Sequence, residues 1–146
     1  MASNRGDILS VDIGGASCKV GRVTAKGDVK DVNRYDPESI RSGGPDALLD
    51  HLRPYVKNHS IDGVALGVPA TVDWEHNHVR SDCEELPWIE DSANKKALQD
   101  GLKRPILMVN DVEALLVGEW LWGELKGYST GVVVSLGESM GSAMLW

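Results

Sequence analysis

The chain has 146 residues and a mass of 15.8 kDa, enough for one domain with a sizeable core. Its net charge of −7 and pI of about 5.0 argue against nucleic acid and anionic membranes as partners. No apolar stretch approaches the roughly 20 residues of a membrane helix, and the first residues do not resemble a signal peptide, so the expected location is the cytoplasm.

The first part of the chain predicts three strands. Apolar and β-branched residues over 8–11 and 20–23 flank Gly14 and Gly15, a pattern typical of a hairpin. Both glycines can adopt φ > 0 and lack a Cβ, so backbone amides there can approach a ligand closely. A third strand is expected over 29–35, which completes a meander.

Helices and strands alternate in the rest of the chain. Helices are expected over 47–57, 92–101 and 112–122, and strands over 63–69, 105–109, 131–136 and 142–146. The first helix starts near Pro45, and Ser92 is the expected N-cap of the second. The polar stretch 70–91 is expected to be a long excursion with a small hairpin around Val72 and Val79. The order predicts an α/β domain with a mixed sheet.

Two glycine-rich turns, over 12–19 and 137–141, are candidates for phosphate binding. If the first and last hairpins lie side by side in one sheet, their turns would hold a phosphate chain between them. Asp12, at the end of the first strand, is placed to hold a metal through water, as Mg²⁺ usually prefers.

Asn110 and Asp111 follow a buried strand at the point where a helix begins, the edge at which α/β sheets bind ligands. Asp111 could accept a proton from a substrate hydroxyl, and Asn110 could orient that hydroxyl. The alternative is that Asp111 only caps the following helix, which spacing alone favours.

Other polar groups give weaker signals. His76 and His78 could bind a metal with Asp82 or Cys83, although solvated loop histidines are the commoner outcome. Cys83 and Cys18 lack metal-ligand spacing and are expected to be free thiols. The acidic pair 84–85 is most simply a solvated surface.

Six motifs in chain order resemble the ROK family of bacterial sugar kinases and repressors, within the actin-like ATPase superfamily. They are 12–19 (family pattern D-x-G-G-T-x-x-K), 67–73 (G-x-P-G-x-V-D), 85–88 (N-L-P-x-W), 110–114 (N-D-A-N-A), 118–127 (G-E-x-x-x-G-x-x-K-G) and 135–143 (T-L-G-T-G-x-G-x-G). The resemblance implies a ribonuclease H-like, actin-like lobe: a mixed five-stranded sheet that opens with a three-strand meander and carries helices on both faces.

The same resemblance implies phosphoryl transfer from ATP, or polyphosphate, to a hexose hydroxyl, with ATP and Mg²⁺ as cofactors. Asp111 would be the general base, with Asn110, Pro69 and Ala70 at the sugar and Asp12 near Mg²⁺. The implied phosphate-binding residues are Gly14, Gly15, Lys19, Gly137 and Gly141.

Three departures from the family pattern affect the implied site. Ala16 and Glu138 replace threonines of the two phosphate loops, and Ala70 replaces a glycine. Glu138 would place a negative charge near phosphate oxygens. A non-catalytic sugar-sensing protein with degenerate phosphate loops is therefore the alternative function.

The resemblance also implies a second lobe that residues 1–146 do not contain, so the isolated lobe is expected to be inactive. The expected partners are a hexose and either that lobe or a second copy of the chain, with no nucleic acid or membrane. No helix-turn-helix precedes the first motif, which argues against a DNA-binding repressor.

Overall fold

A five-stranded mixed sheet forms the centre of the molecule in the computed structural model, which describes residues 6–80, 83–137 and 140–146. The strand order is β3-β2-β1-β4-β7. The bounds are β1 Asp7–Ile13, β2 Cys18–Val23, β3 Val29–Tyr35, β4 Ile61–Val68 and β7 Ile106–Asn110. β1, β2 and β3 pair antiparallel, whereas β4 pairs parallel with both β1 and β7. The predicted meander and mixed sheet are confirmed.

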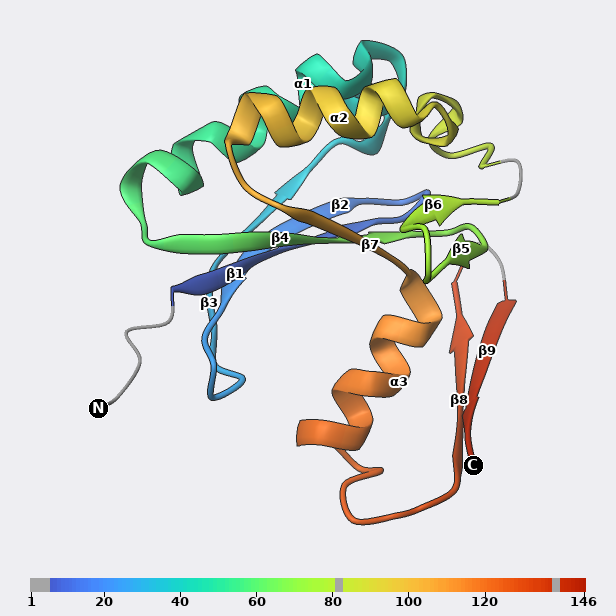
Figure 1. Ribbon diagram of the computed structural model, residues 1–146. Coiled ribbons are helices and arrows are strands. Elements are labelled where there is room, and N and C mark those ends of the chain that lie inside the picture. Colours follow the sequence, from blue (N-terminus) through green and yellow to red (C-terminus); the bar gives the residue numbers. More distant parts are fainter. Residues whose placement is uncertain (1–5, 81–82, 138–139) are drawn as a thin grey trace.

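Helices cover both faces of this sheet, as predicted (Figure 1). The helices α1 (Pro37–Asn58) and α2 (Ser92–Leu102) lie together on one face, and α3 (Asp111–Trp122) lies on the other. The main core fills the space between the sheet and the α1–α2 layer, where β1 contributes Leu9, Val11 and Ile13. None of the helices in the described residues is long and apolar enough to cross a membrane.

Helix α1 begins earlier than predicted, because Asp36 caps it by accepting a hydrogen bond from the Glu38 N–H at 3.0 Å. Gly44, with φ 66° and ψ −156°, interrupts the helical backbone. The predicted helix over 47–57 corresponds to the part after this kink, and Pro54 does not end it. The two glycines before Pro45 therefore mark a kink within α1 and not its start.

The N-cap predicted for α2 is wrong by one residue. The Asp91 carboxylate accepts from the Ala93 N–H at 2.8 Å, and Ser92 is already helical. Asp91 and Ser92 are both good capping residues, so the pattern could not separate them. The helix ends at Leu102, with Lys103 in the left-handed region at φ 53°.

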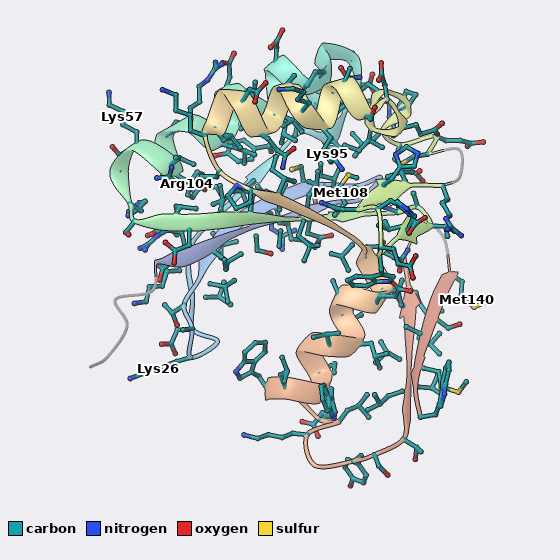
Figure 2. All side chains as sticks on the ribbon, in the orientation of Figure 1. Lys26, Lys57, Lys95, Arg104, Met108 and Met140 are labelled. Carbon is teal, nitrogen blue, oxygen red and sulfur yellow. The ribbon has the colours of Figure 1, made fainter. Side chains whose placement is uncertain are left out.

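The predicted hairpin in the long excursion is confirmed as β5 (Val72–Asp73) and β6 (His78–Val79), followed by the short helix η1 (Pro87–Glu90). Asn77, in the turn, fastens this hairpin to the open edge of β7. Its Nδ2 donates to the Ile106 carbonyl and its Oδ1 accepts from the Met108 N–H, both at 2.7 Å. Lys95 of α2 donates to the Asn77 carbonyl at 2.5 Å. Figure 2 labels Lys95 on α2 and Met108 on β7.

The last hairpin, β8 (Gly131–Leu136) and β9 (Met140–Leu145), forms a separate two-stranded sheet beside α3 (Figure 1). The condition set for a shared phosphate site, that the first and last hairpins lie in one sheet, is therefore not met. The last hairpin packs on α3 instead: a Cβ on Gly141 would lie 2.6 Å from Cγ2 of Val112. The opposite face of β8 and β9 exposes Val132, Val134 and Met144.

Candidate active site

Three neighbouring parallel strands end at one edge of the sheet and bring two carboxylates together. The register pairs Asp12 of β1 with Gly67 of β4, and Gly67 with Val109 of β7, directly before Asn110 and Asp111. A Cβ on Gly67 would lie 3.9 Å from the Asp12 Cα and 4.0 Å from the Asp111 Cα. Because glycine has no side chain, the space between these two residues stays open.

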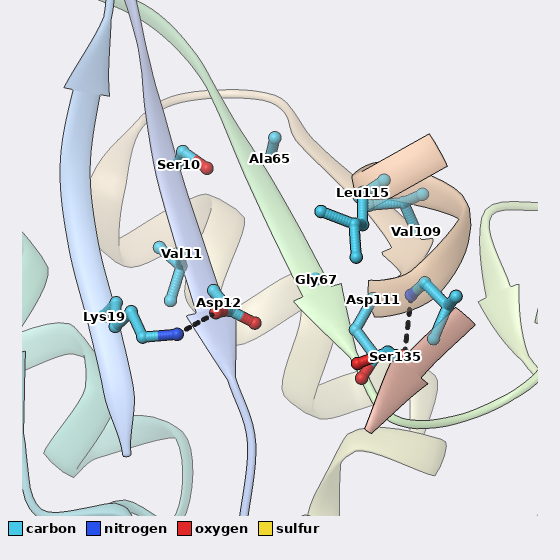
Figure 3. A pocket seen from close by; sticks show the side chains of 12 residues that line it. Ser10, Val11, Asp12, Lys19, Ala65, Gly67, Val109, Asp111, Leu115 and Ser135 are labelled. Atoms are coloured by element: carbon cyan, nitrogen blue, oxygen red, sulfur yellow. Dashed lines mark hydrogen bonds and ion pairs between the residues drawn. The ribbon is translucent and has the colours of Figure 1, made fainter. Parts of the chain in front are cut away.

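A cavity of about 440 Å³ occupies this space, lined among others by Asp12, Lys19, Asp111 and Ser135 (Figure 3). Lys19 lies opposite Asp12 in the β1–β2 pairing, and its Nζ is 2.9 Å from the Asp12 Oδ2. The side chains of Lys19 and Asp12 are 42% and 50% exposed, so solvent screens the pair. Both charges therefore remain accessible to a ligand in the cavity.

Asp111 is the first residue of α3, and its Oδ1 accepts from the Val112 N–H at 2.9 Å. Burial raises the pKa of Asp111, and the negative charges of Asp12 and Glu85 raise it further, while the Val112 N–H acts in the opposite direction. A carboxylate with a raised pKa is a stronger proton acceptor than a surface aspartate.

Asn110, and not Asp111, is the N-cap of α3. Its Oδ1 accepts from the Val112 and Glu113 N–H groups, each at 3.0 Å, and its Nδ2 donates to the Ala70 carbonyl at 3.2 Å. One N–H of the amide is left for a ligand. Asn110 therefore supplies the cap that spacing alone assigned to Asp111, and Asp111 adds a second acceptor for the Val112 N–H.

A second cavity of about 270 Å³ adjoins the first. Pro69, Ala70, Asn110 and Gly141 line it, and Asp111 lines both cavities. The structure therefore brings the predicted sugar-side residues Pro69, Ala70 and Asn110 together on one side of Asp111, and Asp12 and Lys19 on the other. Gly141, predicted at the phosphates, lies with the sugar-side group instead.

The family model of the ROK family matches residues 8–146. The chain belongs to the ROK family.

The relatives and solved structures most similar to this ROK chain include sugar kinases. It is 23% identical over 141 residues to a glucokinase of Streptomyces coelicolor, covering 94% of this chain and 43% of the relative. A glucokinase structure from Streptomyces griseus, in complex with glucose and AMPPNP, has a TM-score of 0.82 at 22% identity, covering 96% of this chain and 44% of that chain. The TM-score shows that this chain has the actin-like fold. Identities this low do not show which reaction the chain takes part in.

The family's fold is not confined to kinases. A ROK family transcriptional regulator, a homolog of the Escherichia coli MLC protein, gives a TM-score of 0.72 at 15% identity, covering 95% of this chain and 36% of that one. This ROK chain spans less than half the length of the curated relatives it matches, between 43% and 46%.

Of the glycines predicted to bind phosphate, Gly14, Gly15 and Gly137 line neither cavity, and Gly141 lines the second one. The Gly14 N–H donates to the Ser17 carbonyl at 3.1 Å and closes the β1–β2 turn. Neither Gly14 nor Gly15 has a positive φ, so the expected left-handed conformation is not found. Gly137 also lies outside both cavities, and Glu138 lies outside the described residues.

The metal site considered for the excursion is not assembled. His76 Nδ1 lies 3.0 Å from Asp73 Oδ2, and Arg80 Nε donates to the same oxygen at 3.0 Å. Within the described ranges no group of three His, Cys, Asp or Glu side chains is placed to hold a metal, and Asp82 lies outside those ranges. Cys18 and Cys83 are buried and free, as predicted.

Sequence reasoning missed Glu85, which was assigned to a solvated surface. The residue is half-buried, its carbonyl accepts from Arg41 Nε at 3.1 Å, and its charge raises the pKa of Asp111. The neighbouring Leu86 is fully buried and holds this segment against the core. The acidic pair 84–85 by itself gave no signal of this burial, because charged side chains are normally solvated.

Proposed function

We propose that the chain is the N-terminal lobe of a hexose kinase that transfers a phosphoryl group from ATP, or polyphosphate, to a hexose hydroxyl. The position of Asp111 carries this proposal. It lines the cavity that holds Asp12 and Lys19 and also the cavity lined by Asn110, Pro69 and Ala70. A phosphoryl donor in the first cavity and a sugar in the second would both adjoin one carboxylate.

Each residue has a role that its surroundings support. Asp111 accepts the proton of the attacking hydroxyl, a task suited to its raised pKa. Asn110 uses its remaining amide N–H to orient the sugar, because its other polar groups hold the backbone in place. Lys19 neutralises phosphate charge at the mouth of the first cavity.

The residues present fit a magnesium nucleotide. Asp12 offers a half-exposed carboxylate to the first cavity, and carboxylate oxygen is a ligand that Mg²⁺ prefers. Asp12 would hold the ion through water, and the ion would neutralise charge on the phosphates of ATP.

A second lobe is part of this proposal, because the matched relatives are more than twice as long as the chain. The exposed apolar side chains on β8, β9 and α3 give that lobe a surface to cover, among them Val134, Met144 and Leu121. Residues 1–146 alone would then lack the closure around both substrates and would be inactive. The cytoplasm remains the predicted location.

A non-catalytic sugar sensor is the second candidate. Ala16 favours it, since this exposed residue brings no hydroxyl to the first turn. The similarity in fold to a transcriptional regulator is compatible with such a role.

The direct test measures ATP-dependent phosphorylation of glucose by the full product of the gene, before and after Asp111→Asn. Loss of a general base is expected to lower kcat by roughly 10²–10⁴-fold. The matched control is Asp46→Asn, which removes the same charge from an exposed position on α1 and should leave kcat unchanged. Equal rates for Asp111→Asn and the parent protein would refute the assignment of the base.

A further inference from the structure

A third cavity, of about 380 Å³, lies between α3, β5 and β9. Thr71 and Asn110 line it together with the 270 Å³ cavity assigned to the sugar, so the two spaces adjoin. Its other walls include Leu116, Met144 and Trp146.

Glu113 brings a carboxylate into this cavity. Its Oε2 is shielded from solvent and has no hydrogen-bond partner among the described residues. The backbone around it is fixed, because the Glu113 N–H donates to the Asn110 cap at 3.0 Å. A buried carboxylate oxygen without a donor is costly, and the cost disappears when a ligand supplies one.

The charge around Glu113 defines the ligand it would accept. No Lys, Arg or His is present among the described residues that line the two adjoining cavities, whereas Asp111 and Glu113 both carry carboxylates. Two negative charges repel an anionic sugar and attract a cation. In the family pattern N-D-A-N-A, an asparagine stands where this chain has Glu113; an asparagine amide both donates and accepts, but an ionised carboxylate only accepts.

We propose that Glu113 binds the protonated amino group of an amino sugar whose hydroxyl lies at Asp111. An ammonium group supplies a charge-assisted hydrogen bond to the unpartnered oxygen. The buried side chain of Leu116 gives the cavity an aliphatic wall, which is compatible with the carbon skeleton of such a ligand. This inference rests on the proposed function, because it names the class of hexose that the site takes.

The test compares D-glucosamine with D-glucose by NMR titration of the ¹⁵N-labelled full product of the gene at about pH 6, where an amine with a pKa near 8 is protonated. We expect glucosamine to bind at least about tenfold more tightly than glucose. Glu113→Gln should remove most of that preference, with little change in the affinity for glucose. Glu124→Gln, the same change at an exposed position after α3, should alter neither affinity.

The outcomes separate the two proposals. Equal binding of both sugars, or a preference for glucosamine that survives Glu113→Gln, contradicts the role of Glu113 and leaves the hexose site intact. Binding of neither sugar contradicts the hexose site and this inference together.

Thermal unfolding without sugar adds a structural readout: a higher Tm for Glu113→Gln is expected from removal of an unpartnered buried charge. A large loss of Tm would indicate that Glu113 has a partner within the fold and would overturn the assignment.

Discussion

At the scale of single residues, Asn110 and Asp111 divide two tasks that one residue could not perform together. Asn110 closes the start of α3 and holds the Ala70 carbonyl. Asp111 is thereby left to face two cavities, in a position where burial raises its pKa. The junction between β7 and α3 thus positions Asp111 as a candidate proton acceptor.

Asn110→Ala is expected to destabilise the protein by about 1–2 kcal/mol, because α3 loses its N-cap. Urea unfolding of the variant and the parent chain measures this difference. Asn110→Asp is the matched comparison: it keeps an oxygen that caps the helix but loses the N–H that donates to Ala70. An alanine variant as stable as the parent would contradict the role of Asn110 as the cap.

The sequence predicted the position of the Asn110–Asp111 pair but not which residue caps. Asparagine and aspartate are nearly equal as N-caps, so only the geometry separates them. The partial burial of Glu113 and Glu85 could not be predicted from the sequence for a related reason. Charged side chains are normally solvated, and only the packing of β5, β9 and the segment before η1 buries them.

At the scale of elements, the β5–β6 hairpin covers the open edge of the sheet at β7. The Asn77 side chain pairs with two backbone groups of β7 at that edge, the Ile106 carbonyl and the Met108 N–H. Asp73 fixes the turn by accepting from the backbone N–H groups of Glu75 and His76 at 3.0 and 3.2 Å. At this edge the Asn77 side chain therefore makes hydrogen bonds to β7 that the backbone of a sixth strand would otherwise make.

The hairpin should contribute to stability in a pH-dependent way. Hydrogen bonds from Arg80 and then from His76 hold the pKa of Asp73 well below its usual range. Because the folded-state pKa lies below the unfolded value of about 3.9, the stabilisation is complete above that pH and shrinks as the pH falls. Asp73→Asn should therefore be less stable than the parent near pH 7, and the difference should narrow by about pH 3.

Denaturant unfolding at both pH values checks this expectation, with Asp46→Asn as a control that should show no difference at either. A gap between Asp73→Asn and the parent that is constant or widens on acidification would contradict it.

Patterns along the sequence identified most helices and strands, but they did not predict which sheet the last hairpin forms or where α1 begins. The strand over 131–136 was evident from its run of three consecutive valines, yet a strand pattern does not specify the sheet that the strand joins. The early start of α1 was missed because Gly43, Gly44 and Pro45 are typical of a helix boundary. Here the chain continues as a helix through a kink at Gly44.

At the scale of the whole molecule, the described residues form two unequal parts. The five-stranded sheet with α1 and α2 encloses the continuous buried cluster, to which α3, β8 and β9 contribute no member. The second part, α3 with β8 and β9, leaves large apolar side chains exposed, including Trp120 and Leu136. An isolated two-stranded sheet is at most marginally stable in water.

Hydrogen exchange should reflect this division. Amides of β1 and β4 are expected to exchange only through global unfolding, whereas those of β8 and β9 should exchange at least about tenfold faster, a difference of ~1.4 kcal/mol or more. Native-state exchange followed by NMR measures both sets in one sample. Equal protection of β9 and β1 would show that the hairpin belongs to the main cooperative unit.

The most direct test of the kinase proposal is a calorimetric titration of the full gene product with a magnesium complex of a non-hydrolysable ATP analogue, in the presence and absence of hexose. The proposal predicts that both ligands bind and that Asp12→Asn weakens the nucleotide without abolishing sugar binding. Binding of sugar with no binding of the magnesium nucleotide would contradict the kinase and favour the sensor.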